Sequence, residues 1–351
     1  MFHLTETEIM ANWLADEPIR VSVCCITYKQ EQYISQAIDS FLMQRTTFPF
    51  EIIIGEDCGG DGTLAILAEY KNHYPNLIKI ITSEKNVGAN ANFLSVVNAA
   101  RGDYIATCEG DDYWIDELKL KKQYDCLCSM PNVNICFTAA KTIDPNGRHG
   151  IISNYSKINT LIPLSKVVRS GGGFMPTASI FFKKNIVSKI PDWFETAPVG
   201  DIYLQIIASI KDGAAYLPDV TSVYRLNSIG SWSESTITHK KKMCIHKNLN
   251  TLNNYLFYAD SLSELGVDSN DISFLKAVTR SDTAKLLLVG DVKNCELDEL
   301  KQIILNIITV SWSEYKNVSN QQRLIYALKR FYYLPRFIFK LWGFIKVISL
   351  K

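Results

Sequence analysis

The first 140 residues alternate between short apolar runs and segments in which apolar residues recur at helical spacing. Residues 21–27, 50–57, 77–82 and 103–109 are predicted strands, and the first of them is continuously apolar. A segment such as 32–44 places its apolar residues on one face of a helix. A run that is apolar throughout is typical of a strand covered on both faces of its sheet. Repeated strand–helix units predict right-handed crossovers and a mainly parallel sheet, so this region is an α/β domain.

Beyond about residue 140 the pattern changes. Residues 170–182 predict a loop that leads into a strand, and residues 199–210 predict a helix. Residues 213–226 have strand character that Pro218 interrupts. From about residue 236 onward the spacing of apolar residues is helical.

Composition narrows the class of protein. Hydrophobic residues make up 47% and charged residues 21%, as in an ordinary globular protein. The net charge of +1 gives no reason to expect nucleic acid as a partner. The N-terminus lacks the pattern of a secretory signal, and most of the nine cysteines lie in apolar runs, so we expect reduced thiols in the cytoplasm. Cys126 and Cys128 would diverge on a helix and are not expected to form a metal pair.

Polar side chains follow each of the four predicted strands. Thr27 ends the first strand, Asp57 and a glycine-rich turn end the second, Asn86 follows the third, and Glu109 ends the fourth. Because the carboxyl ends of parallel strands meet at one edge of a sheet, these residues predict a site there. The turn after Asp57 lacks the lysine of a phosphate-binding loop, and a plain strand–turn–helix junction explains it equally well.

Three carboxylates, Glu109, Asp111 and Asp112, lie within four residues at the end of the fourth strand. Clustered like charges repel, and a divalent cation such as Mg²⁺ or Mn²⁺ would remove that repulsion because it prefers hard oxygen ligands. The alternative is that Asp112 caps a helix that begins near Tyr113. A cap would leave Glu109 and Asp111 unexplained, so the cluster favours a metal site.

Residues 19–125 resemble the N-terminal half of the inverting family 2 glycosyltransferases, which have the GT-A fold. The motifs that carry the resemblance are "VSVCCITYKQEQYISQAIDSFLMQ", "EIIIGEDCGGDGT", "EKNVGANANF" and "ARGDYIATCEGDDYW". The "EGDDYW" form is similar to a bacterial subgroup that builds O-antigen and capsule repeat units. The resemblance implies a Rossmann-like, mostly parallel central sheet flanked by helices, with a helical C-terminal extension.

The resemblance also implies roles for individual residues. Asp111, the last acid of the DxD-like element, would be the metal ligand, and Asp201 in "PVGDIYLQIIAS" would be the catalytic base, unless it only caps its helix. Gly200 stands where the family has a glutamate, and Asn227 where it often has histidine. The other implied positions are Thr27, Tyr28, Asp57, Asn86, Gly88, Glu109, Gly110, Arg225 and Trp232 for the donor, and Asp112, Trp114, Pro176 and Thr177 for the acceptor.

The implied reaction moves a hexose or N-acetylhexosamine from a UDP-sugar to a saccharide acceptor and forms a β-glycosidic bond by inversion. The acceptor in that subgroup is linked to a polyprenyl diphosphate, and the cation would be Mn²⁺ or Mg²⁺. One alternative is a catalytically silent carbohydrate-binding relative. Another is a nucleotidyltransferase, but such an enzyme would normally carry a glycine-rich phosphate loop, which "VSVCCITYKQ" is not.

These inferences give an expected domain plan. An N-terminal segment, 1–18, precedes a GT-A catalytic domain, 19–235, whose halves 19–125 and 126–235 bind the nucleotide sugar and the acceptor. Residues 236–351 form a helical region. Its tail, 321–351, carries seven Lys or Arg and no acid among aromatic residues, which favours contact with the cytoplasmic face of the inner membrane. The alternative is a helical pair packed on the catalytic domain.

Overall fold

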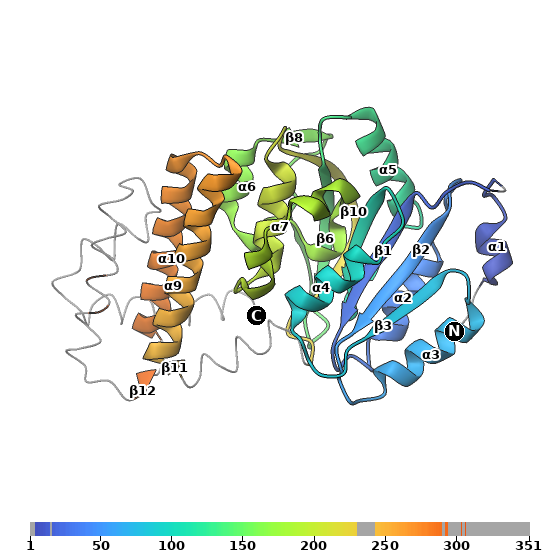
Figure 1. Ribbon diagram of the computed structural model, residues 1–351, viewed down its shortest axis with the longest axis horizontal. Coiled ribbons are helices and arrows are strands. Elements are labelled where there is room, and N and C mark those ends of the chain that lie inside the picture. Colours follow the sequence, from blue (N-terminus) through green and yellow to red (C-terminus); the bar gives the residue numbers. More distant parts are fainter. Residues whose placement is uncertain are drawn as a thin grey trace. The chain divides into compact units, whose positions relative to one another are not determined.

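The computed structural model of the protein describes residues 4–14, 16–229, 243–289 and 292–293, with the single positions 303 and 306. The chain divides into two compact units, Met1–Glu234 and Ser235–Lys351 (Figure 1). Trp232 and the basic tail 321–351 lie outside the described residues, so the expectations for them stay predictions.

The first unit is built on one mixed sheet. Its strands are β1 (Val21–Thr27), β2 (Phe50–Glu56), β3 (Ile78–Thr82), β4 (Tyr104–Glu109), β5 (Tyr113–Trp114), β6 (Ile135–Ile143), β7 (His149–Ile152), β8 (Thr160–Ile162), β9 (Phe181–Lys183) and β10 (Ala214–Arg225). The strand order is β3-β2-β1-β4-β9-β6-β10-β5, with β7 beside β6 and β8 beside β10. The predicted α/β class is confirmed.

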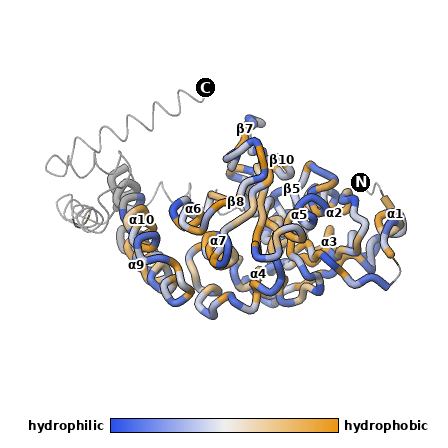
Figure 2. Tube along the Cα trace, turned by 90° about the horizontal axis from the view of Figure 1, so that it is seen from above, coloured by the Kyte–Doolittle hydropathy of each residue, from blue (hydrophilic) through white to orange (hydrophobic). Residues whose placement is uncertain are grey.

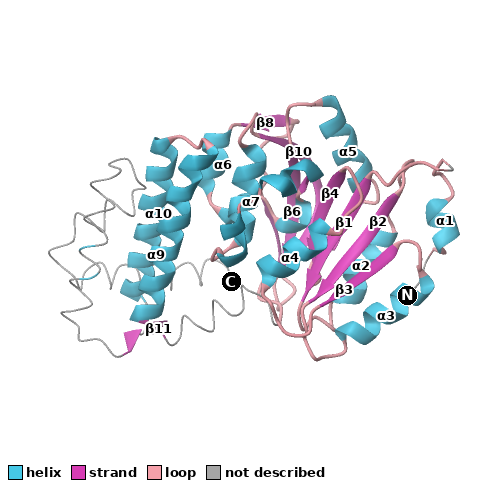
Figure 3. Ribbon diagram, in the orientation of Figure 1, coloured by secondary structure: helices cyan, strands magenta, loops and turns pink. Residues whose placement is uncertain are grey.

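Helices flank this sheet (Figure 3). The α-helices of the first unit are α1 (Glu6–Met10), α2 (Ile34–Leu42), α3 (Thr63–His73), α4 (Ala89–Asn98), α5 (Lys119–Ser129), α6 (Leu164–Ser170) and α7 (Gly200–Ser209). Short 3₁₀ helices cover Gly172–Phe174, Thr177–Ser179, Lys184–Lys189 and Asp192–Thr196. Helices such as α5 alternate between hydrophilic and hydrophobic colour along the chain, as expected where one face lies on the protein core (Figure 2).

The two halves of the sheet differ in strand direction. β3, β2, β1 and β4 are parallel, as the strand–helix alternation predicts. In the second half β9 runs antiparallel to both β4 and β6, and β5, β7 and β8 are antiparallel to their neighbours. β6 and β10 in the second half are also parallel, so the expectation of a mostly parallel sheet is confirmed. The antiparallel pairs arise where short connections such as the turn between β6 and β7 reverse the chain.

Pro218 does not interrupt the strand in which it lies. β10 runs from Ala214 to Arg225, and the register against β6 shifts between Leu217 and Val220. A bulge at this point accommodates a residue that cannot donate a backbone hydrogen bond. The strand therefore continues as far as Arg225, which reaches the polar edge of the sheet.

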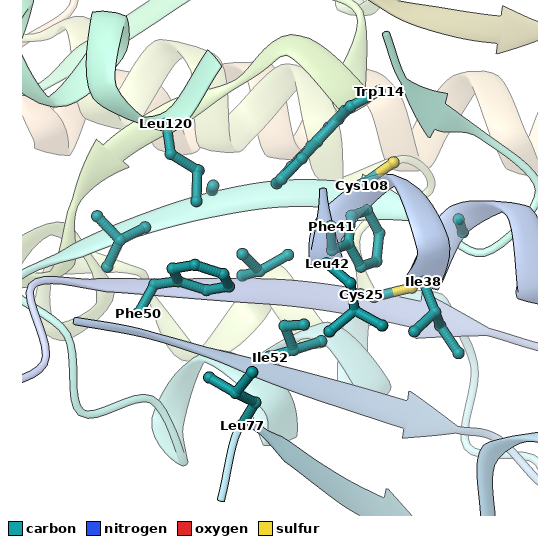
Figure 4. Close-up of a cluster of buried hydrophobic side chains, with 14 of the residues drawn as sticks. Cys25, Ile38, Phe41, Leu42, Phe50, Ile52, Leu77, Cys108, Trp114 and Leu120 are labelled. Atoms are coloured by element: carbon teal, nitrogen blue, oxygen red, sulfur yellow. The ribbon is translucent and has the colours of Figure 1, made fainter. Parts of the chain in front are cut away.

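α2 and α4 cover opposite faces of the parallel strands (Figure 1). On the α2 side, Ile34, Ile38 and Phe41 are fully buried at helical spacing, as their sequence pattern predicts. These side chains join the core cluster that is drawn with Phe50, Ile52 and Trp114 among its members (Figure 4). The core thus buries the side chains that β1, β2 and β4 contribute to it, and the carboxyl ends of these strands lie at one edge of the sheet.

The second unit, described by itself, is helical as the spacing beyond residue 236 predicts. α9 (Ile245–Ser261) and α10 (Ser269–Val289) pack against each other, joined by a 3₁₀ turn, Leu262–Leu265. A parallel pair of short strands, β11 (Met243–Cys244) and β12 (Val292–Lys293), lies in the same unit. Within the described residues, no helix combines the length and the apolar character needed to span a membrane.

Candidate active site

The polar residues that follow the parallel strands meet at one edge of the sheet. In the strand register Thr27 on β1 lies beside Glu56 on β2, and Ile26 lies beside Glu109 on β4. The loop after β1 and the loop after β2 are tied together, because the backbone N–H of Asp57 donates to the carbonyl of Thr27 at 3.1 Å. The predicted gathering of strand ends is confirmed.

The acid loop, residues 109–112, runs directly past the end of β1. The N–H of Gly110 donates to the carbonyl of Ile26 at 2.9 Å. A Cβ at Gly110 would lie 2.5 Å from Oε1 of Gln30 and 2.8 Å from Oγ1 of Thr27, distances that no real Cβ contact permits. Only glycine therefore lets the acid loop approach this closely, which gives the middle residue of the DxD-like element a steric role.

Asp111 is held in place by three residues from two segments of the chain, the end of β10 and the loop after β1. Its Oδ2 accepts a hydrogen bond from the Ser228 hydroxyl, and its backbone carbonyl accepts one from the guanidinium of Arg225. The side chain is only 5% exposed, and this burial raises its pKa above the ordinary value, although hydrogen bonds from Ser228 and Gln30 act in the opposite direction. The predicted metal ligand is thus an oriented, buried carboxylate.

The sequence assigned no role to Gln30 or Ser228. Gln30 belongs to the polar cluster that follows β1, and it also accepts a hydrogen bond from the Thr27 hydroxyl at 2.9 Å. Ser228 lies three residues after Arg225, beyond the end of β10. No local pattern reveals that either residue contacts Asp111, because each lies far from it along the chain.

Arg225, the last residue of β10, donates hydrogen bonds to the acid loop. Its backbone N–H donates to Oδ1 of Asp112 at 2.8 Å, and its guanidinium donates to Asp111 and to the side chain of Gln36. The guanidinium also lies over the rings of Tyr113 and Tyr33, at 4.6 Å and 5.1 Å. Arg225 therefore has a structural role, and its contact with the donor diphosphate stays a prediction.

Asp112 and Trp114 were expected on the acceptor side, and the structure corrects both. Asp112 is completely buried; it precedes the strand β5 and therefore does not cap a helix near Tyr113. Trp114 is 1% exposed, packs on Phe41 with ring centroids 4.7 Å apart, and donates from Nε1 to the carbonyl of Ala178 at 2.8 Å. Side chains enclosed in this way cannot contact an acceptor.

Pro176 and Thr177 lie at the 3₁₀ turn after Phe174. Pro176 is buried and Thr177 is half-buried, while the carbonyl of Thr177 accepts from the Thr107 hydroxyl on β4 at 2.6 Å. The turn is therefore attached to the strand that ends in Glu109. Contact of either residue with an acceptor stays a prediction.

Glu109 and Asp201 are acidic residues of the first unit whose pKa values are both raised. The pKa of Glu109 is raised to about 8, first by burial and then by the negative charges of Asp111 and Asp201. Asp201 stands in the first turn of α7, where Val199 rather than Asp201 is the N-cap residue. Its Oδ1 accepts from the N–H of Ile202 at 2.7 Å, and burial raises its pKa. The role of Asp201 as the catalytic base stays a prediction.

Asp57 organises the loop that follows β3. One carboxylate oxygen accepts from the N–H of Val87 at 2.7 Å, and the other accepts from the N–H of Gly88 at 2.9 Å. Gly88 has a positive φ of 91°, which glycine adopts without strain, and it immediately precedes α4. Asn86 in this loop is exposed. Each carboxylate oxygen of Asp57 keeps a second lone pair that can accept another hydrogen bond. Contact of Asp57 with a uracil ring stays a prediction.

Tyr28 and Lys29 form the exposed rim beside Thr27. Tyr28 is half-buried, Lys29 is exposed, and the ammonium group of Lys29 lies 5.1 Å from the centre of the Tyr28 ring. Thr27 itself is only 3% exposed. Of these three residues, Tyr28 and Lys29 are accessible to a ligand, and their roles toward a nucleotide stay predictions.

The donor set of the acid loop suits a hard divalent cation. Glu109 and Asp111 offer carboxylate oxygens, and Oδ2 of Asp112 is buried without a hydrogen-bond partner. The pKa of Asp112 is raised by burial and then by the charges of Asp111 and Glu109, so this loop concentrates negative charge that a cation would relieve. The described residues contain no cluster of three or more metal-binding side chains. A cation held by one or two carboxylates takes its other ligands from substrate phosphates and water.

Comparison with known proteins shows what the chain is similar to. Residues 22–187 match the model of the family described as Glycosyl transferase family 2. An uncharacterized protein of Mycobacterium tuberculosis, Rv1520, is 37% identical over 223 residues, which cover 63% of this chain and 63% of that relative.

Two solved structures share the fold. The crystal structure of Staphylococcus aureus TarS 1–349 in complex with UDP-GlcNAc matches with a TM-score of 0.65, at 16% identity, and covers 92% of this chain and 90% of that one. The Pyrobaculum calidifontis mannosyltransferase PcManGT, in complex with GDP-Man and Mn²⁺, matches with a TM-score of 0.51, at 13% identity, over 94% and 88% of the two chains. Residues 22–187 of this chain are therefore similar to the Glycosyl transferase family 2, and the fold is that of the GT-A glycosyltransferases.

Proposed function

We propose that this chain is an inverting, metal-dependent glycosyltransferase that moves a hexose or N-acetylhexosamine from a UDP-sugar to a saccharide acceptor. The observation that carries the proposal is the meeting of the strand ends that bear Thr27, Glu56 and Glu109 at one edge of the sheet. The buried Asp111 carboxylate, close to Glu109 in sequence, is held by a hydrogen bond from the Ser228 hydroxyl. The UDP-GlcNAc bound by TarS supports a UDP-sugar donor, and the GDP-Man bound by PcManGT supports only the broader class of nucleotide sugars.

In the proposed reaction the acceptor hydroxyl attacks the anomeric carbon of the donor. The bond from that carbon to the diphosphate oxygen breaks, its electron pair leaves with UDP, and Asp201 takes the proton of the hydroxyl. A single displacement inverts the configuration, so an α-linked donor gives a β-glycoside. Burial raises the pKa of Asp201, which makes its carboxylate a stronger base, and general base catalysis typically contributes a factor of ~10²–10⁴.

The departing diphosphate must be stabilised as its negative charge grows. A divalent cation, Mn²⁺ or Mg²⁺, held by Asp111 with Glu109 beside it, would supply Lewis-acid stabilisation when bound. Ser228 and Gln30 orient the Asp111 carboxylate through their hydrogen bonds. Arg225 fixes the backbone of the acid loop, so that the ligand is positioned before the donor arrives.

The acceptor and the location of the enzyme are also proposed. The subgroup-like form of the acid loop supports a polyprenyl-diphosphate-linked saccharide in the synthesis of a cell-surface polysaccharide. The basic, aromatic tail 321–351 supports binding at the cytoplasmic face of the inner membrane. Co-sedimentation with anionic vesicles tests this part, and the full chain should bind while a chain that ends at residue 320 should not. Equal binding of the two chains would contradict it.

The experiment that tests the activity is a screen of UDP-sugars with Mn²⁺ and saccharide acceptors, read as UDP release and as glycoside product. Asp111→Ala should lose cation-dependent UDP release. Asp201→Asn should keep UDP binding but lose ~10²–10⁴ in the rate of transfer. Asp125→Asn, at an exposed ion pair on α5, serves as the control and should match wild type. UDP release that persists undiminished in Asp111→Ala would contradict the metal assignment, and a wild-type protein that binds donor without transfer would favour the silent relative.

A further inference from the structure

The side chain of Asn90 connects two parts of the first unit that the sequence separates widely. Asn90 lies in the first turn of α4, directly after the loop that Asp57 holds. Its Nδ2 donates to the carbonyl of Ala197 at 2.8 Å and to that of Phe194 at 3.0 Å, with the carbonyl of Glu195 at 3.5 Å. Both hydrogens of the amide are thus directed into the segment that leads into α7.

The space around Asn90 explains why residue 200 is glycine. A Cβ at Gly200 would lie 2.4 Å from Oδ1 of Asn90 and 3.0 Å from Cζ of Phe194. The glutamate that the related family carries at this position would displace the Asn90 amide. Asn90 and Gly200 therefore fit together as a pair, and the first residue of α7 rests directly on the side chain of Asn90.

The next residue of α7 is Asp201, whose carboxylate is confined on a second side. A Cβ at Gly172 would lie 3.1 Å from Oδ1 of Asp201, so the backbone of this glycine packs closely over the carboxylate. Asn90 supports the start of α7 from one direction, and Gly172 limits the carboxylate from another. Movement of the segment 194–197 would therefore move Asp201.

The support also extends back toward the donor side. Asp57 accepts hydrogen bonds from Val87 and Gly88, the residues that lead into α4. A continuous set of contacts thus runs from the end of β2, through the first turn of α4, to the first turn of α7. These contacts join the predicted nucleotide contact to the predicted base.

We propose that Asn90 is a positioning residue that fixes the start of α7, and with it the Asp201 carboxylate, for proton transfer from the acceptor hydroxyl. The inference rests on the proposed function, in which Asp201 is the base. It goes beyond that function by assigning to Asn90 a contribution to the rate that does not involve contact with the substrate. Because misplacement of a catalytic group by about 1 Å can cost a factor of ~10², the loss of both hydrogen bonds should be visible in kcat.

The test compares Asn90→Ala and the isosteric Asn90→Asp with the control Asn98→Ala, an exposed asparagine at the end of the same helix. Asn90→Ala should lower kcat for transfer about ten- to a hundredfold, while the KM for the UDP-sugar and the Kd for UDP stay within about twofold. Asn90→Asp should be at least as impaired, since its carboxylate faces backbone carbonyls. Asn98→Ala should match wild type in all three measurements.

In Gly200→Ala the added Cβ would displace the Asn90 amide. This variant should therefore also lower kcat while the KM for the UDP-sugar stays within about twofold. It keeps the inference testable if Asn90→Ala does not fold. In a background of Asp201→Asn, adding Asn90→Ala should change the residual rate by less than about twofold, because the residue acts through the base.

A normal kcat in both Asn90→Ala and Gly200→Ala would overturn the inference. So would a loss of kcat that is undiminished in the Asp201→Asn background, or one that comes with an equal loss of UDP affinity. These outcomes leave the proposed function intact, provided that the wild-type chain transfers sugar. Absence of transfer by wild type would overturn the proposed function itself, and this inference with it.

Discussion

Glu109→Gln should stabilise the cation-free protein at alkaline pH, although it alters the candidate active site. The pKa of Glu109 is raised from 4.5 to about 8, by burial and by Asp111 and Asp201. In the unfolded chain the carboxyl group ionises near its ordinary value, so the folded state binds the extra proton. The contribution of Glu109 to the free energy of unfolding is therefore greatest at low pH. It falls as the pH rises from about 4.5 and levels off above about 8.

The size of the effect follows from the shift. A change from 4.5 to about 8 corresponds to an upper limit of roughly 5 kcal/mol, at about 1.4 kcal/mol per unit. Glu109 is only half-buried, and relaxation and solvent will reduce this, so we expect about 2 kcal/mol. Glutamine keeps the shape without the charge. Glu109→Gln should accordingly be more stable than wild type by about that amount near pH 9, and about equal near pH 4.

The assay is urea unfolding in a chelator at several values between about pH 4 and about pH 9. Glu117→Gln provides a matched control, because Glu117 is exposed and pairs with Arg45 at the surface at 3.0 Å. Its effect should stay below about 1 kcal/mol. Parallel curves of unfolding free energy against pH for wild type and Glu109→Gln would refute the reasoning, since they would mean that burial and neighbouring charges do not act on this carboxyl group.

Three further substitutions test other contacts of the site. Asp57→Asn should weaken UDP binding and lower the free energy of unfolding in urea by about 2 kcal/mol. The substitution replaces one carboxylate oxygen by an NH₂ group, which cannot accept the hydrogen bond from the N–H of Val87 or Gly88. Wild-type values of both quantities would contradict this. Arg225→Lys should cost about 1–3 kcal/mol and lower Mn²⁺ affinity in calorimetry, since lysine loses the fork and the stacking on Tyr113; an unchanged affinity would argue against its hold on the acid loop. Gly110→Ala should reduce Mn²⁺-dependent UDP release at least about tenfold, because its Cβ would displace Gln30, and full activity would refute the steric role.

The parallel half of the fold could be predicted because its signals are local. Continuous apolar runs mark β1, β2, β3 and β4, and the polar residues after them identify the edge of the sheet. In the structure the register of β1 and β4 places Glu109 beside the end of β1, at the edge where the sequence predicts a site. The antiparallel pairs in the second half of the sheet have no such local signals. β9 is only three residues long, and contacts between distant segments determine its neighbours.

Parts of the site were beyond local patterns for the same reason. Asp112 and Trp114 lie one and three residues after the candidate metal ligand Asp111, yet both side chains are buried. Ser228, Gln30 and Asn90 carry ordinary polar side chains, and only the fold shows which backbone or carboxylate each contacts. A side chain whose role depends on a distant partner leaves no periodicity in the sequence.

The central claim is that Asp111 holds a divalent cation against the donor diphosphate. Crystals of the full chain grown with UDP and Mn²⁺, measured at the manganese absorption edge, test it most directly. The account predicts an anomalous peak about 2 Å from a carboxylate oxygen of Asp111 and from a diphosphate oxygen. UDP bound in the site with manganese located away from Asp111 would contradict it.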